Sequence, residues 1–230
     1  MLLDIKDITV YIISPATDKY RSKLLTVFER VIDEGFKHVV FFKSVAGPNK
    51  TASLTNTVIE IFKKELNNET PFIILEDDCA FFTKYDKIEV PDDTDILYLG
   101  VSLWAYPYDT CTLYSRIRPN IICNSIDTVE SYNGDLVKIM GMTSGHAILY
   151  ISRDFIRKFL YKIADISMYI DDVPHDLLFS SLHKSFNVFG LKQPMFYQDA
   201  SLGGQEDVTK LTFDIDCFTP SHIENAHFSQ

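Results

Sequence analysis

The chain has 230 residues, of which 46% are hydrophobic, and its net charge is −10. This length and hydrophobic content predict one large buried core in a single domain, with or without a tail. The acidic balance argues against nucleic acid as a partner, because binding phosphates requires a basic face.

The sequence shows no recognisable targeting segment, and this and its cysteine usage predict a cytoplasmic protein. Acidic residues stand in the first seven positions, where a signal peptide needs an apolar core, and no apolar run approaches the ~20 residues of a membrane span. The four cysteines have no CxxC spacing, which favours reduced thiols. A Cys111–Cys123 bridge is the less favoured alternative.

The first hundred residues predict alternating strands and helices. Strands are expected at 8–14, 38–42, 71–75 and 95–100, and helices at 18–33 and 52–66. This alternation predicts an α/β fold with a doubly wound, mostly parallel central sheet flanked by helices.

The second half is less regular. Residues 101–140 predict loops and a hairpin around Asn133-Gly134. A strand at 146–151, helices at 153–163 and 174–184, and a strand region at 188–197 broken by Pro194 follow. We expect one domain over 1–210, with 211–230 as a tail or a linker to further domains.

The most informative motif joins a buried strand to three acids. Pro71 to Leu75 is continuously apolar, as in a strand buried on both faces, and Glu76, Asp77 and Asp78 follow directly. Parallel sheets bind ligands at the carboxyl ends of their strands. Adjacent carboxylates repel one another unless a cation neutralises them. The motif therefore predicts a divalent metal at this edge of the sheet, although a solvated turn is the alternative.

Three further segments have both a functional and a structural interpretation. The small residues before His146 let backbone approach a ligand closely, or form a turn with an incidental histidine. Asp176 lies in the first turn of a predicted helix, as a catalytic base or as a favourable charge at the helix terminus. Gln198 ends a strand and either faces a ligand or is a polar exit.

Three common enzyme motifs are missing from the sequence. Residues 47–51 lack the second glycine of a phosphate-binding GxxxxGK[ST] loop, and no GxGxxG follows the first strand. No nucleophile elbow of the GxSxG kind is present. A P-loop triphosphatase, a dinucleotide oxidoreductase and a serine hydrolase are therefore disfavoured.

With these segments in order, the chain resembles GT-A nucleotide-sugar glycosyltransferases over residues 8–200. It is most similar to glycosyltransferase family twenty-five, and also to glycosyltransferase domains of large algal DNA viruses. The segment 74–78 matches the family's LEDD motif. Weaker similarities lie at 10–14 with 19–21, 95–100, 146–153, 174–178 and 193–198. The family's Gly-Cys-x-x-Ser-His segment is here 51–56, a departure that weakens the expected donor or acceptor contacts of this helix.

The resemblance implies a UDP-sugar donor, Mn²⁺ or Mg²⁺ as cofactor, and a glycan or glycoprotein acceptor. It assigns the metal to Asp78 and Glu76, and the base, or a group that positions the sugar, to Asp176. The resemblance adds His146 to the catalytic residues. It also implies six residues that contact the nucleotide: Ser14, Ala16, Arg21, Ser53, Glu76 and Asp77. Two alternatives stay open: a metal-dependent phosphodiesterase or nuclease, and a non-catalytic nucleotide-sugar-binding module.

Overall fold

A computed structural model describes residues 1–15, 17–106, 129–132, 134–165 and 175–204. The strands are β1 (Leu2–Asp4), β2 (Thr9–Ser14), β3 (Val39–Lys43), β4 (Phe72–Glu76), β5 (Cys79–Phe81), β6 (Lys87–Glu89), β7 (Ile96–Tyr106), β8 (Val129–Ser131), β9 (Leu136–Ile139), β10 (Met142–Tyr150), β11 (Val188–Leu191) and β12 (Phe196–Gln198). The helices are α1 (Asp18–Asp33), α2 (Lys50–Glu65), α4 (Arg153–Asp165) and α5 (His175–His183), with short 3-10 turns η1 (Ile5–Asp7) and η5 (Ala200–Leu202).

The central sheet has eight strands in the order β3-β2-β4-β10-β7-β11-β9-β8. Within the described residues, β3, β2, β4, β7, β11 and β8 point in one direction, while β10 and β9 point in the other. The predicted α/β class with a mostly parallel sheet is therefore confirmed. The antiparallel direction of β10, at the centre of the sheet, is not apparent from the sequence.

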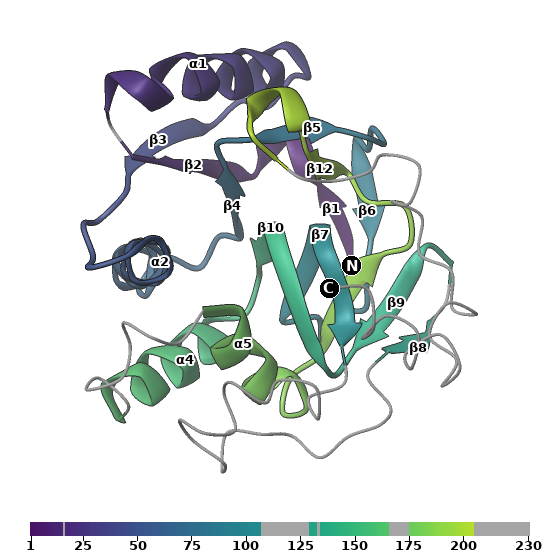
Figure 1. Ribbon diagram of the computed structural model, residues 1–230. Helices are drawn as coiled ribbons and strands as arrows, with labels where there is room; N and C mark the ends of the chain where they lie inside the picture. The colour runs from purple at the N-terminus through teal and green to yellow at the C-terminus, as the bar shows by residue number, and fades with distance from the viewer. Residues whose placement is uncertain (16, 107–128, 133, 166–174, 205–230) are drawn as a thin grey trace, which may run out of the picture.

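Helices cover both faces of this sheet (Figure 1). Side chains of α2, α4 and α5 pack on one face, around Phe62, Phe159 and Phe179. Side chains of α1, together with β1, β6 and β12, pack on the other face, around Val27 and Val31. Both faces of β4 are thus buried, which explains its unbroken apolar sequence.

The predicted elements and the observed ones agree well in the first hundred residues. Helix α1 covers 18–33 as expected, and Gly35 follows it with a φ of 96°, a conformation that glycine adopts most easily. The expected hairpin of 101–140 is present as the antiparallel pair β8–β9, although its turn residue Asn133 lies outside the described part. Strand β7 is longer than predicted and reaches Tyr106.

Two small sheets were not predicted. Strands β1 and β6 form an antiparallel pair, and so do β12 and β5, which lie side by side in Figure 1. All four strands have only three residues, too short for an alternating pattern to identify. The β5–β12 pair is important for the site because β5 follows the three acids directly.

Candidate active site

The three acids at the end of β4 do not face the same way. Side chains of a strand alternate between the two faces of the sheet. Ile74 packs in the core layer of α2 and α5, and Leu75 in the layer of α1. Glu76 continues the first face, where its side chain lines a small cavity of about 10 Å³ together with His175 of α5.

Gln198, the last residue of β12, brings two of the acids together. Its Nε2 donates to Oε2 of Glu76 over 3.2 Å and lies 3.5 Å from Oδ1 of Asp78. The β5–β12 register fixes this position, because Gln198 pairs with Cys79, the residue after Asp78. The backbone N–H of Asp199 also donates to the carbonyl oxygen of Asp78 over 2.7 Å. One amide group therefore faces the Glu76–Asp78 pair.

The electrostatic environment opposes ionisation of Glu76. Burial raises the pKa of Glu76 to about 8, and the negative charges of Asp78, Asp176 and Asp77 act in the same direction. The hydrogen bond from Gln198 opposes this rise. Burial also raises the pKa of Asp78, with the charge of Asp77 adding to it. A cation at this position would relieve the repulsion.

Asp77 contacts the end of the neighbouring strand β2. The hydroxyl of Ser14, the last residue of β2, donates to Oδ2 of Asp77. Burial raises the pKa of Asp77, while the bond from Ser14 and the positive charge of Lys23 lower it. The charge of Lys23 acts on Asp78 as well. The positive charge of Lys23, on α1, therefore favours the ionised form of both aspartates.

Asp176 lies in the first turn of α5 and contributes negative charge to the same corner. Its Oδ2 accepts a hydrogen bond from the hydroxyl of Ser144, on β10, over 3.1 Å. Its Oδ1 is buried, lies 3.3 Å from Nε2 of His175, and has no hydrogen-bond partner among the described residues. A buried carboxylate oxygen without a hydrogen bond is costly, which fits a group that acts on a ligand.

His146 is buried and holds β12 in place. Its side chain is 3% exposed, and its Nε2 lies 3.2 Å from the carbonyl oxygen of Phe196. In the tautomer with the proton on Nε2, the imidazole donates this bond. Burial lowers the pKa of His146 to about 4, so the ring is neutral at pH 7. The catalytic role expected for His146 stays a prediction; its geometry is that of a positioning residue for the β12 strand that bears Gln198.

The other expected nucleotide contacts are more dispersed. Arg21 is exposed on α1. The hydroxyl of Ser53 donates to the carbonyl oxygen of Val45 over 2.6 Å and thus anchors the loop before α2. Ala16 lies outside the described residues. Among the described residues of the predicted nucleotide set, Ser14 is the one outside the acids that forms a hydrogen bond with an acid, Asp77.

The donor set at Glu76 and Asp78 fits a hard divalent cation. Within the described residues, no group of three His, Cys, Asp or Glu side chains is arranged to hold a metal ion. Mg²⁺ is commonly held by one or two carboxylates, with substrate phosphates and water completing the shell. The carboxylates of Glu76 and Asp78, whose negative charges repel each other, meet this description.

Lys23 and Ser144 were missed by the sequence analysis, and Gln198 was left open. Lys23 lies two residues beyond the expected Arg21, on the same helix. Ser144 is part of the Thr143-Ser144-Gly145 segment, whose small residues indicated a close approach of backbone. Nothing in the local sequence of Gln198 indicates that β12 pairs with β5.

Comparisons with known proteins find partly similar structures but identify no family. No protein-family model and no curated protein sequence matches the chain. One similar structure is a glycosyltransferase involved in the glycosylation of the major capsid of PBCV-1, with 8% identity, coverage of 95% of this chain and 99% of that one, and a TM-score of 0.48. Another is the nucleoside-diphosphate-sugar pyrophosphorylase from Vibrio cholerae RC9, with 10% identity, coverage of 80% and 72%, and a TM-score of 0.41.

Membership of glycosyltransferase family twenty-five therefore stays a prediction, and the function depends on the site itself. Among the described helices, none is long and apolar enough to cross a membrane. The domain limits at 210 and 211 also stay a prediction, because residues 205–230 lie outside the described part.

Proposed function

We propose that this chain is a metal-dependent glycosyltransferase that moves a sugar from a UDP-sugar donor to a hydroxyl of a glycan or glycoprotein acceptor. The observation that carries the proposal is the partly buried Glu76–Asp78 pair joined by Gln198 at the carboxyl end of β4. This is the edge where α/β sheets bind their ligands. The sequence similarity of 74–78 to the LEDD motif supports the same assignment.

Asp78 and Glu76 would hold Mn²⁺ or Mg²⁺ through their carboxylate oxygens. A bound divalent cation would stabilise the negative charge that develops on the diphosphate as the sugar–phosphate bond breaks. Lys23 supplies a further positive charge beside Asp77 and Asp78, in a position to bind diphosphate oxygens. Ser14 orients Asp77 through its hydroxyl, which leaves the other carboxylate oxygen of Asp77 for ribose hydroxyls.

Asp176 is the residue proposed to act at the acceptor. If the transfer inverts the anomeric centre, the carboxylate of Asp176 accepts the proton of the acceptor hydroxyl. The oxygen of that hydroxyl then bonds to the anomeric carbon, and the electron pair of the broken sugar–phosphate bond leaves with UDP. The bond from Ser144 holds the carboxylate in place for this step. If the transfer retains configuration, Asp176 positions sugar hydroxyls instead.

The substitution Asp78→Asn tests the proposal, because it removes one carboxylate charge and keeps the shape of the side chain. We expect wild-type protein to be stabilised against heat by UDP and Mn²⁺ added together, and the variant to lose this stabilisation and metal-dependent UDP-sugar hydrolysis. The control is Asp33→Asn, which removes an exposed acid at the end of α1 and should change neither measurement.

Two results would contradict the proposal. Full metal-dependent turnover by Asp78→Asn would remove Asp78 from the site. Metal-dependent hydrolysis of a phosphodiester substrate without turnover of any UDP-sugar would favour the phosphodiesterase alternative instead.

A further inference from the structure

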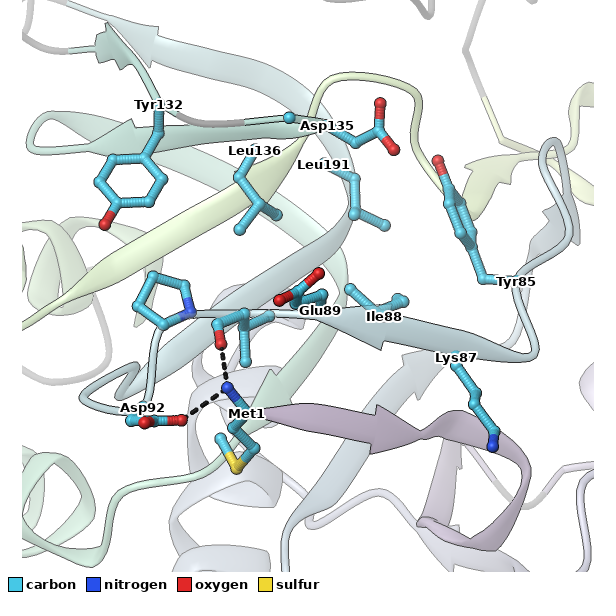
Figure 2. A pocket seen from close by; sticks show the side chains of 13 residues that line it. Met1, Tyr85, Lys87, Ile88, Glu89, Asp92, Tyr132, Asp135, Leu136 and Leu191 are labelled. Carbon is cyan, nitrogen blue, oxygen red and sulfur yellow. Dashed lines mark hydrogen bonds and ion pairs between the residues drawn. The ribbon is translucent and has the colours of Figure 1, made fainter.

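A second cavity, of about 540 Å³, lies between strand β6 on one side and strands β9 and β11 on the other (Figure 2). Neither the acids of β4 nor Gln198 is among its lining residues. The cavity, called here the β6–β9 cleft, is therefore separate from the candidate active site. The sequence analysis gave no indication of it, because its walls come from distant parts of the chain.

Two tyrosine rings stand at opposite ends of the cleft (Figure 2). Tyr132 is 42% exposed, and its ring centroid lies 4.8 Å from that of Phe189, at an interplanar angle of 61°. Tyr85, at the opposite end of the cleft, is held by its hydroxyl, which donates to the carbonyl oxygen of Gln193 over 3.0 Å. Both rings are thus held in place before a ligand arrives, which lowers the entropy cost of binding.

The loop that bears one side of the cleft is also anchored. The backbone N–H of Tyr132 donates to the carbonyl oxygen of Leu136 over 3.2 Å. Lys192 binds the loop twice: its Nζ donates to the carbonyl oxygen of Gly134 over 2.7 Å, and its backbone N–H to that of Asp135 over 2.8 Å. The position of Asp135 is therefore fixed by backbone contacts.

Apolar and acidic groups lie between the two rings. Leu136 and Leu191 form the wall opposite β6, and the side chain of Glu89 points from β6 into the space between the walls (Figure 2). Asp135 lies on the Leu191 side, towards Tyr85 (Figure 2). Glu89 and Asp135 are exposed, and neither forms an ion pair with another described residue. Both carboxylates are available to accept hydrogen bonds.

This combination selects for one ligand chemistry. The C–H faces of a sugar ring are apolar and pack on aromatic rings, whereas its hydroxyls donate well to carboxylates. A phosphorylated ligand would be repelled by Glu89 and Asp135, because the two cations that line the cleft do not oppose them. The ammonium group of Met1 is paired with Asp92 over 2.6 Å, and the side chain of Lys87 points away from the space between the walls (Figure 2). A pocket with fixed aromatic walls and a few polar groups is typical of a small-molecule site.

We propose that the β6–β9 cleft is a binding site for a neutral saccharide, in which Tyr132 and Tyr85 pack on sugar rings and Glu89 and Asp135 accept bonds from sugar hydroxyls. Binding here requires neither nucleotide nor metal. The site thus goes beyond the proposed transfer reaction, and one natural use would be to hold a sugar unit remote from the one that reacts.

The experiment measures binding of cellobiose, maltose, lactose and xylobiose to the whole chain by saturation-transfer difference NMR, without UDP or metal. We expect saturable binding of at least one disaccharide at millimolar concentrations. Tyr132→Ala and Asp135→Asn should each weaken this binding about tenfold, since each removes one ring contact or one charge-assisted hydrogen bond. Glu89→Gln provides a second acid variant if Asp135→Asn does not fold.

Matched controls separate this site from the acids of β4. Tyr161→Ala removes a tyrosine that is 74% exposed on α4, outside the cleft, and should leave binding unchanged. Asp78→Asn should also keep disaccharide binding while it loses the response to UDP and Mn²⁺. The proposal is overturned if no disaccharide binds, or if binding survives Tyr132→Ala together with the acid variants, or if Asp78→Asn abolishes it.

Discussion

Neighbouring acids at the end of β4 have different surroundings, so each of them makes different contacts. Glu76 faces the α5 side, where it shares a small cavity with His175. Asp77 is bound by Ser14 of β2, and Asp78 lies in the turn beneath Gln198. The sequence motif therefore contains one pair, Glu76 and Asp78, and a third acid with a separate contact.

Among single residues, Gln198 is the one at which a substitution that introduces a charge has the clearest expected consequence. Gln198→Glu replaces the amide donor by a third carboxylate beside the partly buried Glu76 and Asp78. We expect the free energy of unfolding without metal to fall by about 1–3 kcal/mol, because the donor is lost and the repulsion grows. Added Mn²⁺ should stabilise this variant more than it stabilises the wild-type protein.

Urea unfolding with and without Mn²⁺ measures both effects. The control is Gln193→Glu, which places the same new charge on an exposed side chain of the segment between β11 and β12. Equal stabilities of Gln198→Glu and Gln193→Glu under both conditions would contradict the proposed role of Gln198.

Among the elements, the β5–β12 pair completes the site. Its register sets Gln198 against Cys79, and the bond from His146 to the carbonyl oxygen of Phe196 ties β12 to β10. Close packing against β7 is also required. A Cβ atom on Gly100 would lie 2.5 Å from Nε2 of His146 and 2.7 Å from the carbonyl oxygen of Phe196. Glycine at this position lets β12 approach the central sheet.

Gly100→Ala tests this contact between elements. We expect the free energy of unfolding to fall by about 1–3 kcal/mol, because the added methyl group overpacks the β7–β12 contact. The stabilisation by UDP and Mn²⁺ should weaken as well, since β12 bears Gln198. Thermal unfolding with and without the ligands measures both quantities.

A double variant identifies the cause. The cost of Gly100→Ala should be smaller in a His146→Ala background, because part of the steric conflict is then removed. Strictly additive effects would show that the imidazole and the new methyl group do not meet.

For the whole molecule, the helix layer of α2, α4 and α5 is joined to the sheet by a buried histidine as well as by apolar packing. Both ring nitrogens of His183, on α5, are used: Nδ1 lies 2.7 Å from the carbonyl oxygen of Gly141, and Nε2 lies 3.1 Å from the hydroxyl of Tyr98 on β7. The neutral ring donates one bond and accepts the other. Burial lowers the pKa of His183 to about 4.

This depressed pKa predicts how stability depends on pH. Below about 6.5, the ordinary pKa of histidine, the unfolded chain binds a proton at His183 that the folded protein does not take up until about pH 4. The free energy of unfolding should therefore fall as the pH decreases from about 6.5 to 4, by at most about 1.4 kcal/mol per pH unit for this residue.

The comparison with His183→Asn isolates the contribution of this histidine. Asparagine keeps a donor and an acceptor but does not titrate, so the variant should be less stable at pH 7 and show a shallower decrease towards pH 4. Urea unfolding at a series of pH values measures the slopes. A slope equal to that of the wild-type protein would contradict this prediction.

The sequence by itself determined the central strands, the main helices and the place of the acids. Hydrophobic periodicity and the residues that end helices and strands specify these features. An amphipathic helix such as α1 and a strand buried on both faces such as β4 are each defined by residues close in sequence. Glu76 ends β4 and the two aspartates follow it, so the location of the acids at the carboxyl edge also followed from local information.

Only the tertiary structure decided which side chains meet at that edge. The antiparallel β10, the short β5–β12 pair and the β6–β9 cleft bring together segments far apart in the chain, and three-residue strands carry too little pattern to reveal their partners. Pairing of Gln198 with the acids, the charge of Lys23 and the bond from Ser144 to Asp176 all depend on such contacts. Their physical basis is long-range strand register and packing, which residue type alone does not encode.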